Sequence, residues 1–227
     1  MSVIPVDLES EIRSCTRCAM LLAVHPENPP RSMHGVLPKP IMSEPMRAPV
    51  MLIGQAPGLT EYETGRPFSG QAGDGIRKLF ADCGVDPADF DRIVYQTSAV
   101  KCFPGRKKNK ERWEDRQPSG VMLRYCSGFL ERQINAVRPH LVVAMGGVAT
   151  KAFDQIRGLP RRKLSDVLGT SESWQGITIV YLAHTSGGSR FLNDQANRIK
   201  QDRAKAILSS EVASLDMSKI SDVTREL

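Results

Sequence analysis

Four short apolar runs, each about as long as a strand, recur along the chain and are separated by stretches with helical periodicity. The runs are 50–54, 93–99, 141–145 and 177–182. The helical stretches are 73–83, 122–137, 148–156 and 193–209. Strands that alternate with helices form parallel sheets, because a helical crossover returns the chain to the same end of the sheet. The pattern predicts an α/β fold: a three-layer α/β/α sandwich with a central, mainly parallel four-stranded sheet.

Three segments depart from this alternation. Residues 26–49 are rich in proline and predict an irregular excursion. Residues 105–120 predict an exposed basic loop, and residues 210–227 predict a loosely held helix or disordered tail because they contain few large apolar residues. The length of 227 residues fits one core, so we expect a single domain over 1–227 and a monomer.

The chain shows no signal of a membrane or secreted protein. No apolar run approaches the roughly 18 residues that a membrane span needs, and the first residues lack the basic and apolar regions of a signal peptide. We therefore expect a cytoplasmic protein, associated with the nucleoid if the source is bacterial.

Sharp turns follow two of the predicted strands at their carboxyl ends. Gly54-Gln55-Ala56-Pro57-Gly58 comes directly off the first strand, and His184-Thr185-Ser186 follows the last. Glycine lets the backbone approach a ligand closely, and Phe68 offers an aromatic face on which a flat ring can stack. Because ligands of α/β sheets gather at the carboxyl ends of the strands, these turns predict a site for a small planar ligand.

Four of the five cysteines form two pairs that predict a metal site. Cys15 and Cys18 lie on one tight turn, and Cys102 with Cys126 could complete four sulfur ligands. A cytosolic protein keeps its thiols reduced, which favours metal binding over disulfides. Four thiolates suit either zinc or an iron–sulfur cluster, and the chemistry of the residues leaves both open. Cys83, at the end of a helical stretch, is predicted to be a small buried apolar residue.

Charge favours a nucleic-acid partner. The net charge is +6 and the pI is about 9.2. The segment 105–113 concentrates basic residues beside Trp113, where phosphate contacts and base stacking would both be useful. Its first basic residues are Arg106, Lys107, Lys108 and Lys110. The alternative is a solvated loop whose charges only keep the chain soluble.

Together these motifs resemble the uracil-DNA glycosylase superfamily, most closely its iron–sulfur branch, family four, with some features of family five. The resemblance covers roughly residues 10–210 and is specific as a combination. It rests on an ungapped stretch from Gly54 to Gly73, and on Val100-Lys101-Cys102, the run 141–146 and His184-x-Ser186.

The resemblance implies a DNA repair glycosylase that flips uracil out of DNA and hydrolyses its N-glycosidic bond, without strand cleavage. His184 would donate a hydrogen bond to the base, Phe68 would stack on it, and Glu61 would orient water or stabilise the cationic sugar. Glu61 could equally be an ordinary loop acid. Further expected contacts are Gln55, Ala56 and Ser98 to the base and Ser186 and Arg190 to DNA, with Cys15, Cys18, Cys102 and Cys126 binding a structural [4Fe-4S] cluster.

Two departures from the family pattern affect these expectations. Gln55 stands where the family has a glutamate, so one carboxylate that could assist water is absent. Ser98 stands where the family commonly has asparagine, and a hydroxyl reads the edge of a base less completely than an amide does. We therefore expect some tolerance for other deaminated bases. A protein of another class, an iron–sulfur protein that binds damaged DNA tightly or without catalysis, is the alternative.

Overall fold

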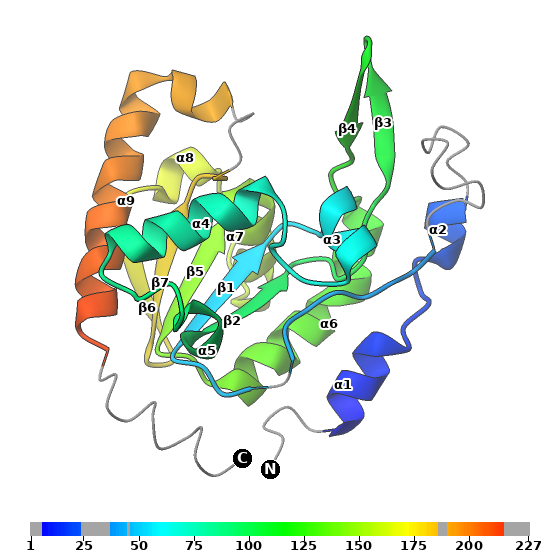
Figure 1. The fold of residues 1–227 in the computed structure, drawn as a ribbon, viewed down its shortest axis with the longest axis horizontal. Helices are drawn as coiled ribbons and strands as arrows, with labels where there is room; N and C mark the ends of the chain where they lie inside the picture. Colours follow the sequence, from blue (N-terminus) through cyan, green and yellow to red (C-terminus); the bar gives the residue numbers. More distant parts are fainter. Residues whose placement is uncertain (1–5, 24–36, 45, 186–189, 216–227) are drawn as a thin grey trace.

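The computed structural model describes residues 6–23, 37–44, 46–185 and 190–215. Its centre is a five-stranded sheet in the order β2-β1-β5-β7-β6 (Figure 1). The parallel strands are β1 (Val50–Gly54), β2 (Val94–Ser98), β5 (Leu141–Met145) and β7 (Ile177–Leu182). These are the four strands expected from the apolar runs.

The expectation of only four strands is wrong, because β6 (Ser171–Trp174) adds a fifth along the edge of β7. Its sequence, Ser-Glu-Ser-Trp, is polar and alternates in exposure, and it runs antiparallel to β7. An edge strand faces solvent on one side, so it lacks the apolar run that identifies a buried strand.

Helices cover both faces of the sheet. Leu52 and Val143 pack with α4 (Gln71–Asp82), α5 (Phe90–Ile93) and α9 (Gln195–Ala213) on one face. Met51 and Val142 pack with α1 (Val6–Arg13), α6 (Gly120–Val137) and α7 (Gly146–Ile156) on the other. Alternate side chains of each strand are therefore buried on opposite faces, which is why the strands read as continuous apolar runs. The three-layer α/β/α sandwich is confirmed.

The four expected helices form with ends shifted by a few residues, whereas several short helices were not expected. These are α1, α2 (Ala19–Ala23), α3 (Leu59–Thr64), α5, α8 (Leu164–Val167) and the 3-10 turn η1 (Arg190–Asn193). Most span little more than one turn, too few residues to show a helical period. Cys83 follows α4 and is partly rather than fully buried against the core. No helix in the described ranges combines the length and apolar character needed to cross a membrane.

The described part of the proline-rich segment, 37–44 and 46–49, contains no helix or strand, as expected. Residues 26–36 and the end of the tail, 216–227, lie outside the described residues. The beginning of the expected tail continues α9 as far as Ala213.

The segment 105–120, expected to be a loop, contains a hairpin of β3 (Arg106–Asn109) and β4 (Arg112–Asp115). Arg106 pairs with Asp115 and Lys108 with Trp113, and Lys110 turns the chain in the left-handed conformation. Figure 1 shows this hairpin projecting from the body of the molecule beside α3. Its residues are mostly charged and exposed, so no apolar alternation marked the two strands in the sequence.

A network of charged side chains joins the end of α7 to the edge strand. Arg162 pairs with Asp154 on α7 and with Glu172 on β6, and Arg157 also pairs with Glu172. Tyr181 on β7 accepts hydrogen bonds from both arginines and donates one to Glu172. The network adds ionic contacts to the strand pairing and to the packing of Trp174 on Phe153, which together attach β6 to the sheet.

Candidate active site

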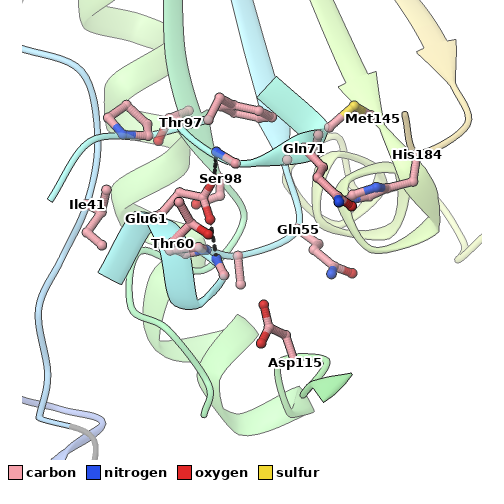
Figure 2. Close-up of a pocket in the computed structure, with 18 of the residues that line it drawn as sticks. Ile41, Gln55, Thr60, Glu61, Gln71, Thr97, Ser98, Asp115, Met145 and His184 are labelled. Carbon is pink, nitrogen blue, oxygen red and sulfur yellow. Dashed lines mark hydrogen bonds between the residues drawn. The ribbon is translucent and has the colours of Figure 1, made fainter. Parts of the chain in front are cut away.

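A cavity of about 400 Å³ opens at the carboxyl edge of the sheet, where the loops after β1, β2 and β7 meet (Figure 2). Gly54 at the end of β1 lies level with Ser98 at the end of β2. This register brings segments far apart in the sequence to one place. All six residues expected to contact or act on a base line the cavity: Gln55, Ala56, Glu61, Phe68, Ser98 and His184.

Two glycines allow Phe68 to take its place beside β1. A Cβ on Gly54 would lie 2.8 Å from Phe68 Cζ, and a Cβ on Gly73 would lie 1.7 Å from the Phe68 carbonyl oxygen. Phe68 itself has a φ of 49°, which is uncommon for a bulky residue. Gly54 thus makes room for the aromatic ring at the cavity wall, and Gly73 makes room for the backbone of Phe68.

Glu61 holds the two glycine-rich turns together. Its Oε2 accepts a hydrogen bond from the Gly58 amide at 2.9 Å, and its Oε1 accepts one from the Gly70 amide at 2.8 Å (Figure 2). Both oxygens of the carboxylate are therefore engaged by backbone. This geometry gives Glu61 a clear role in shaping the cavity, and its expected role in orienting water stays a prediction.

His184 follows β7 and is largely buried at the far wall of the cavity from the hairpin. Burial lowers the pKa of its imidazole, and the charge of Glu61 acts in the opposite direction. The next residue, Thr185, donates a hydrogen bond from its hydroxyl to the Ala72 carbonyl oxygen at 2.7 Å, which anchors the turn to α4. At neutral pH the ring is neutral and can donate one hydrogen bond without carrying charge.

Ser98 lies 5% exposed at the end of β2. Its hydroxyl donates to the Val100 carbonyl oxygen at 2.8 Å, so toward the cavity it can act only as an acceptor. The buried ammonium of Lys101 donates to the Ser98 carbonyl oxygen at 2.6 Å and to Thr97 Oγ1 at 2.8 Å. These bonds fix the strand end that carries Ser98.

The four paired cysteines lie near one another between the N-terminal segment, the loop after β2 and α6. Burial, reinforced by the neighbouring thiols, raises the pKa of Cys18 to about 11 and that of Cys102 to about 12. Cys15 and Cys126 contribute to both shifts. Within the described ranges, however, no group of three or more His, Cys, Asp or Glu side chains is arranged to hold a metal ion.

The expected DNA contacts divide between the hairpin and the turn after β7. Lys107, Lys108 and Lys110 are exposed, whereas Arg106 is partly buried at the base of the hairpin. Ser186 lies outside the described residues, and of Arg190 only the backbone position at the start of η1 is described.

Two further residues of the cavity wall, Asp115 and Arg116, come from the base of the hairpin. Asp115 Oδ2 accepts a hydrogen bond from the Leu59 amide at 3.1 Å, and its Oδ1 lies 3.2 Å from Arg106 Nε. Sequence reasoning missed both residues. The hairpin is far from the first loop in the sequence, and nothing in its charged residues signals that it packs against that loop.

Comparison with known proteins agrees with this geometry. The family model of the uracil DNA glycosylase superfamily matches residues 41–207. A type-4 uracil-DNA glycosylase of Pyrobaculum aerophilum is 34% identical over 124 residues, which are 55% of this chain and 57% of the relative. One of Saccharolobus solfataricus is 27% identical over 75% of this chain and 76% of the relative.

A type-5 uracil-DNA glycosylase of Pyrobaculum aerophilum is 29% identical over 67% of this chain and 70% of that protein. The chain spans little more than half the length of the Pyrobaculum type-4 relative. The family match nevertheless covers the cavity from Ile41 to His184 and most of the sheet. The chain belongs to the uracil DNA glycosylase superfamily.

Proposed function

We propose that this protein is a monofunctional uracil-DNA glycosylase that hydrolyses the N-glycosidic bond of a flipped base and leaves an abasic site. One observation carries the proposal: six residues expected from separate motifs line a single cavity in a chain of this superfamily. The relatives named type-4 uracil-DNA glycosylase support the same reaction.

The cavity suits the chemistry of base release. Its volume of about 400 Å³ lies within the range of small-molecule sites. A flipped base would stack on Phe68, and neutral His184 would donate to a base oxygen as negative charge develops on the leaving group. Among the described residues that line the cavity there is no lysine, the residue that a strand-cleaving glycosylase would use as nucleophile.

Single-turnover release of uracil from single- and double-stranded oligonucleotides tests the proposal. We expect free uracil and an alkali-labile abasic site, with an intact strand before alkali treatment. Tight binding of uracil-containing DNA without release would instead support the non-catalytic alternative, and neither binding nor release would contradict both.

DNA is the proposed partner of the basic hairpin. Lys107, Lys108 and Lys110 are exposed on an arm that projects from the body of the molecule (Figure 1). The base of this arm lines the cavity, so the lysines could contact phosphates next to a flipped base. The monomeric state remains a prediction.

Cys15, Cys18, Cys102 and Cys126 are the proposed ligands of a [4Fe-4S] cluster. The charges of neighbouring thiols raise the pKa values of Cys18, Cys102 and Cys126, a cost that a cationic centre would relieve. Four thiolates suit either zinc or a cluster, and the resemblance to family four favours the cluster. When bound, the cluster would tie the N-terminal segment to α6.

Metal analysis of the purified protein separates the two centres. We expect a brown protein with equal iron and acid-labile sulfide, a colour that Cys83→Ser retains and Cys126→Ser loses. A colourless protein with one zinc would contradict the cluster.

A further inference from the structure

The cavity contains a carboxylate that no motif of the sequence assigned. Asp115 lies at the end of β4 and lines the cavity on the side of the hairpin. Figure 2 shows its carboxylate pointing into the cavity, toward the loop that carries Gln55. The residue comes from the hairpin between Cys102 and Cys126, whereas Gln55, Glu61 and His184 come from loops at the carboxyl edge of the sheet.

One hydrogen bond and one ion pair fix the position of this carboxylate. The Leu59 amide donates to Oδ2, and Arg106 across the hairpin faces Oδ1. A Cβ on Gly58 would lie 2.7 Å from Asp115 Oδ2 and 2.9 Å from Glu61 Oε2. Asp115 thus packs closely against Gly58 of the first loop, and its side chain is still 39% exposed.

The other candidates for activating water are less suited to it. Gln55 carries an amide, which cannot accept a proton from water at neutral pH. Both oxygens of Glu61 are engaged by the Gly58 and Gly70 amides. Asp115 also has one polar partner on each oxygen, but its side chain is 39% exposed and its carboxylate points into the cavity, so water can reach its remaining lone pairs.

The electrostatic surroundings of Asp115 favour a base. Burial raises the pKa of its carboxyl, the Leu59 amide and Arg106 lower it, and the charge of Glu61 raises it. Arg116 and His184 also line the cavity. The net shift is upward, which strengthens the carboxylate as a proton acceptor.

We propose that Asp115 orients and deprotonates the water that attacks the sugar. It would take over the role of the family's glutamate, whose position in this chain is occupied by Gln55. This proposal rests on the proposed glycosylase function. The water oxygen bonds to C1′ as the bond between C1′ and N1 of uracil breaks. The electron pair of the broken C1′–N1 bond leaves with the uracil anion. One water proton passes to Asp115 and then returns to the anion through solvent, which leaves uracil and an abasic sugar.

Asp115→Asn tests the proposal because it keeps the size of the side chain and an acceptor for the Leu59 amide. We expect single-turnover uracil release at neutral pH to fall by about 100-fold, while the affinity for uracil-containing DNA stays within a few-fold. The acid limb of the wild-type pH–rate profile should vanish, a change that a purely structural role would not produce. The double variant Gln55→Glu with Asp115→Asn should recover at least about tenfold of the loss.

Glu114→Gln is the matched control, because Glu114 is the adjacent acid on the opposite face of the hairpin. Its carboxylate accepts a hydrogen bond from the Asn109 side chain. It should release uracil at the wild-type rate. The proposal is overturned if Asp115→Asn releases uracil at the wild-type rate. It is also overturned if the variant is slower but keeps the acid limb of its pH–rate profile and is not rescued by adding Gln55→Glu. A wild type that releases no uracil would overturn the proposed function as well, so the two failures are distinguishable.

Discussion

At the residue scale, His184 is the group best placed to stabilise a departing base. It lies partly buried at the cavity wall with a lowered pKa, and its turn is anchored to α4 by Thr185. His184→Ala should reduce single-turnover base release by about 100-fold or more, because a donor to the developing anion is lost. DNA affinity should change little. Full activity of the variant would remove His184 from the mechanism.

Ser98 decides how completely the edge of a base is read. Its hydroxyl proton is committed to the Val100 carbonyl oxygen, so it can accept from N3–H of uracil but cannot donate to O4. The wild type should therefore release hypoxanthine, xanthine or a 5-substituted uracil at measurable rates, and Ser98→Asn should shift preference toward uracil.

Single-turnover rates on a panel of bases measure this shift. One unpaired polar group is worth about 1–3 kcal/mol of discrimination. A wild type strict for uracil, with Ser98→Asn unchanged or inactive, would show that Ser98 does not face the base.

At the element scale, the β3–β4 hairpin is an arm with little apolar contact of its own, so its exposed charges are available to a partner. Replacing both Lys107 and Lys108 with alanine should weaken DNA binding and reduce the slope of log K against log salt by about two, one for each lost phosphate contact. Fluorescence anisotropy across a salt series measures both effects.

Lys205→Ala on α9 is the matched control, because Lys205 is an exposed lysine on a helix that lies away from the hairpin (Figure 1). It should leave the salt slope unchanged. An equal loss of slope in both variants would mean that the hairpin makes no specific contribution.

At the scale of the whole molecule, the network around Glu172 makes stability depend on acid pH. Burial raises the pKa of this carboxyl, but hydrogen bonds from Arg162, Arg157 and Tyr181 outweigh it and lower the pKa to about 2. A pKa lowered by folding stabilises the protein fully above the ordinary value of 4.5, and that contribution is lost as pH falls toward 2. The free energy of unfolding should decline across this interval.

Urea unfolding at several pH values measures the decline. Glu172→Gln should be less stable than the wild type at neutral pH and should show a shallower decline between about pH 4.5 and 2. If the free energy of unfolding declines equally in the two proteins, Glu172 is not the source of the acid sensitivity.

The sequence by itself determined the parts of this protein that depend on local patterns. Strands β1, β5 and β7 have the predicted bounds because strands buried on both faces must be continuously apolar. The glycine turns and His184 could be assigned to one site because carboxyl ends of parallel strands meet at one edge.

Only the tertiary structure decided the rest. Strand β6 and the β3–β4 hairpin are polar and largely solvent-facing, so neither has the apolar run or alternation that would identify a strand in the sequence. The meeting of Asp115 with Leu59, and of Glu61 with Gly70, depends on how separate loops pack against one another. Contacts of this kind form only when the whole chain folds, and the local sequence around each residue does not predict them.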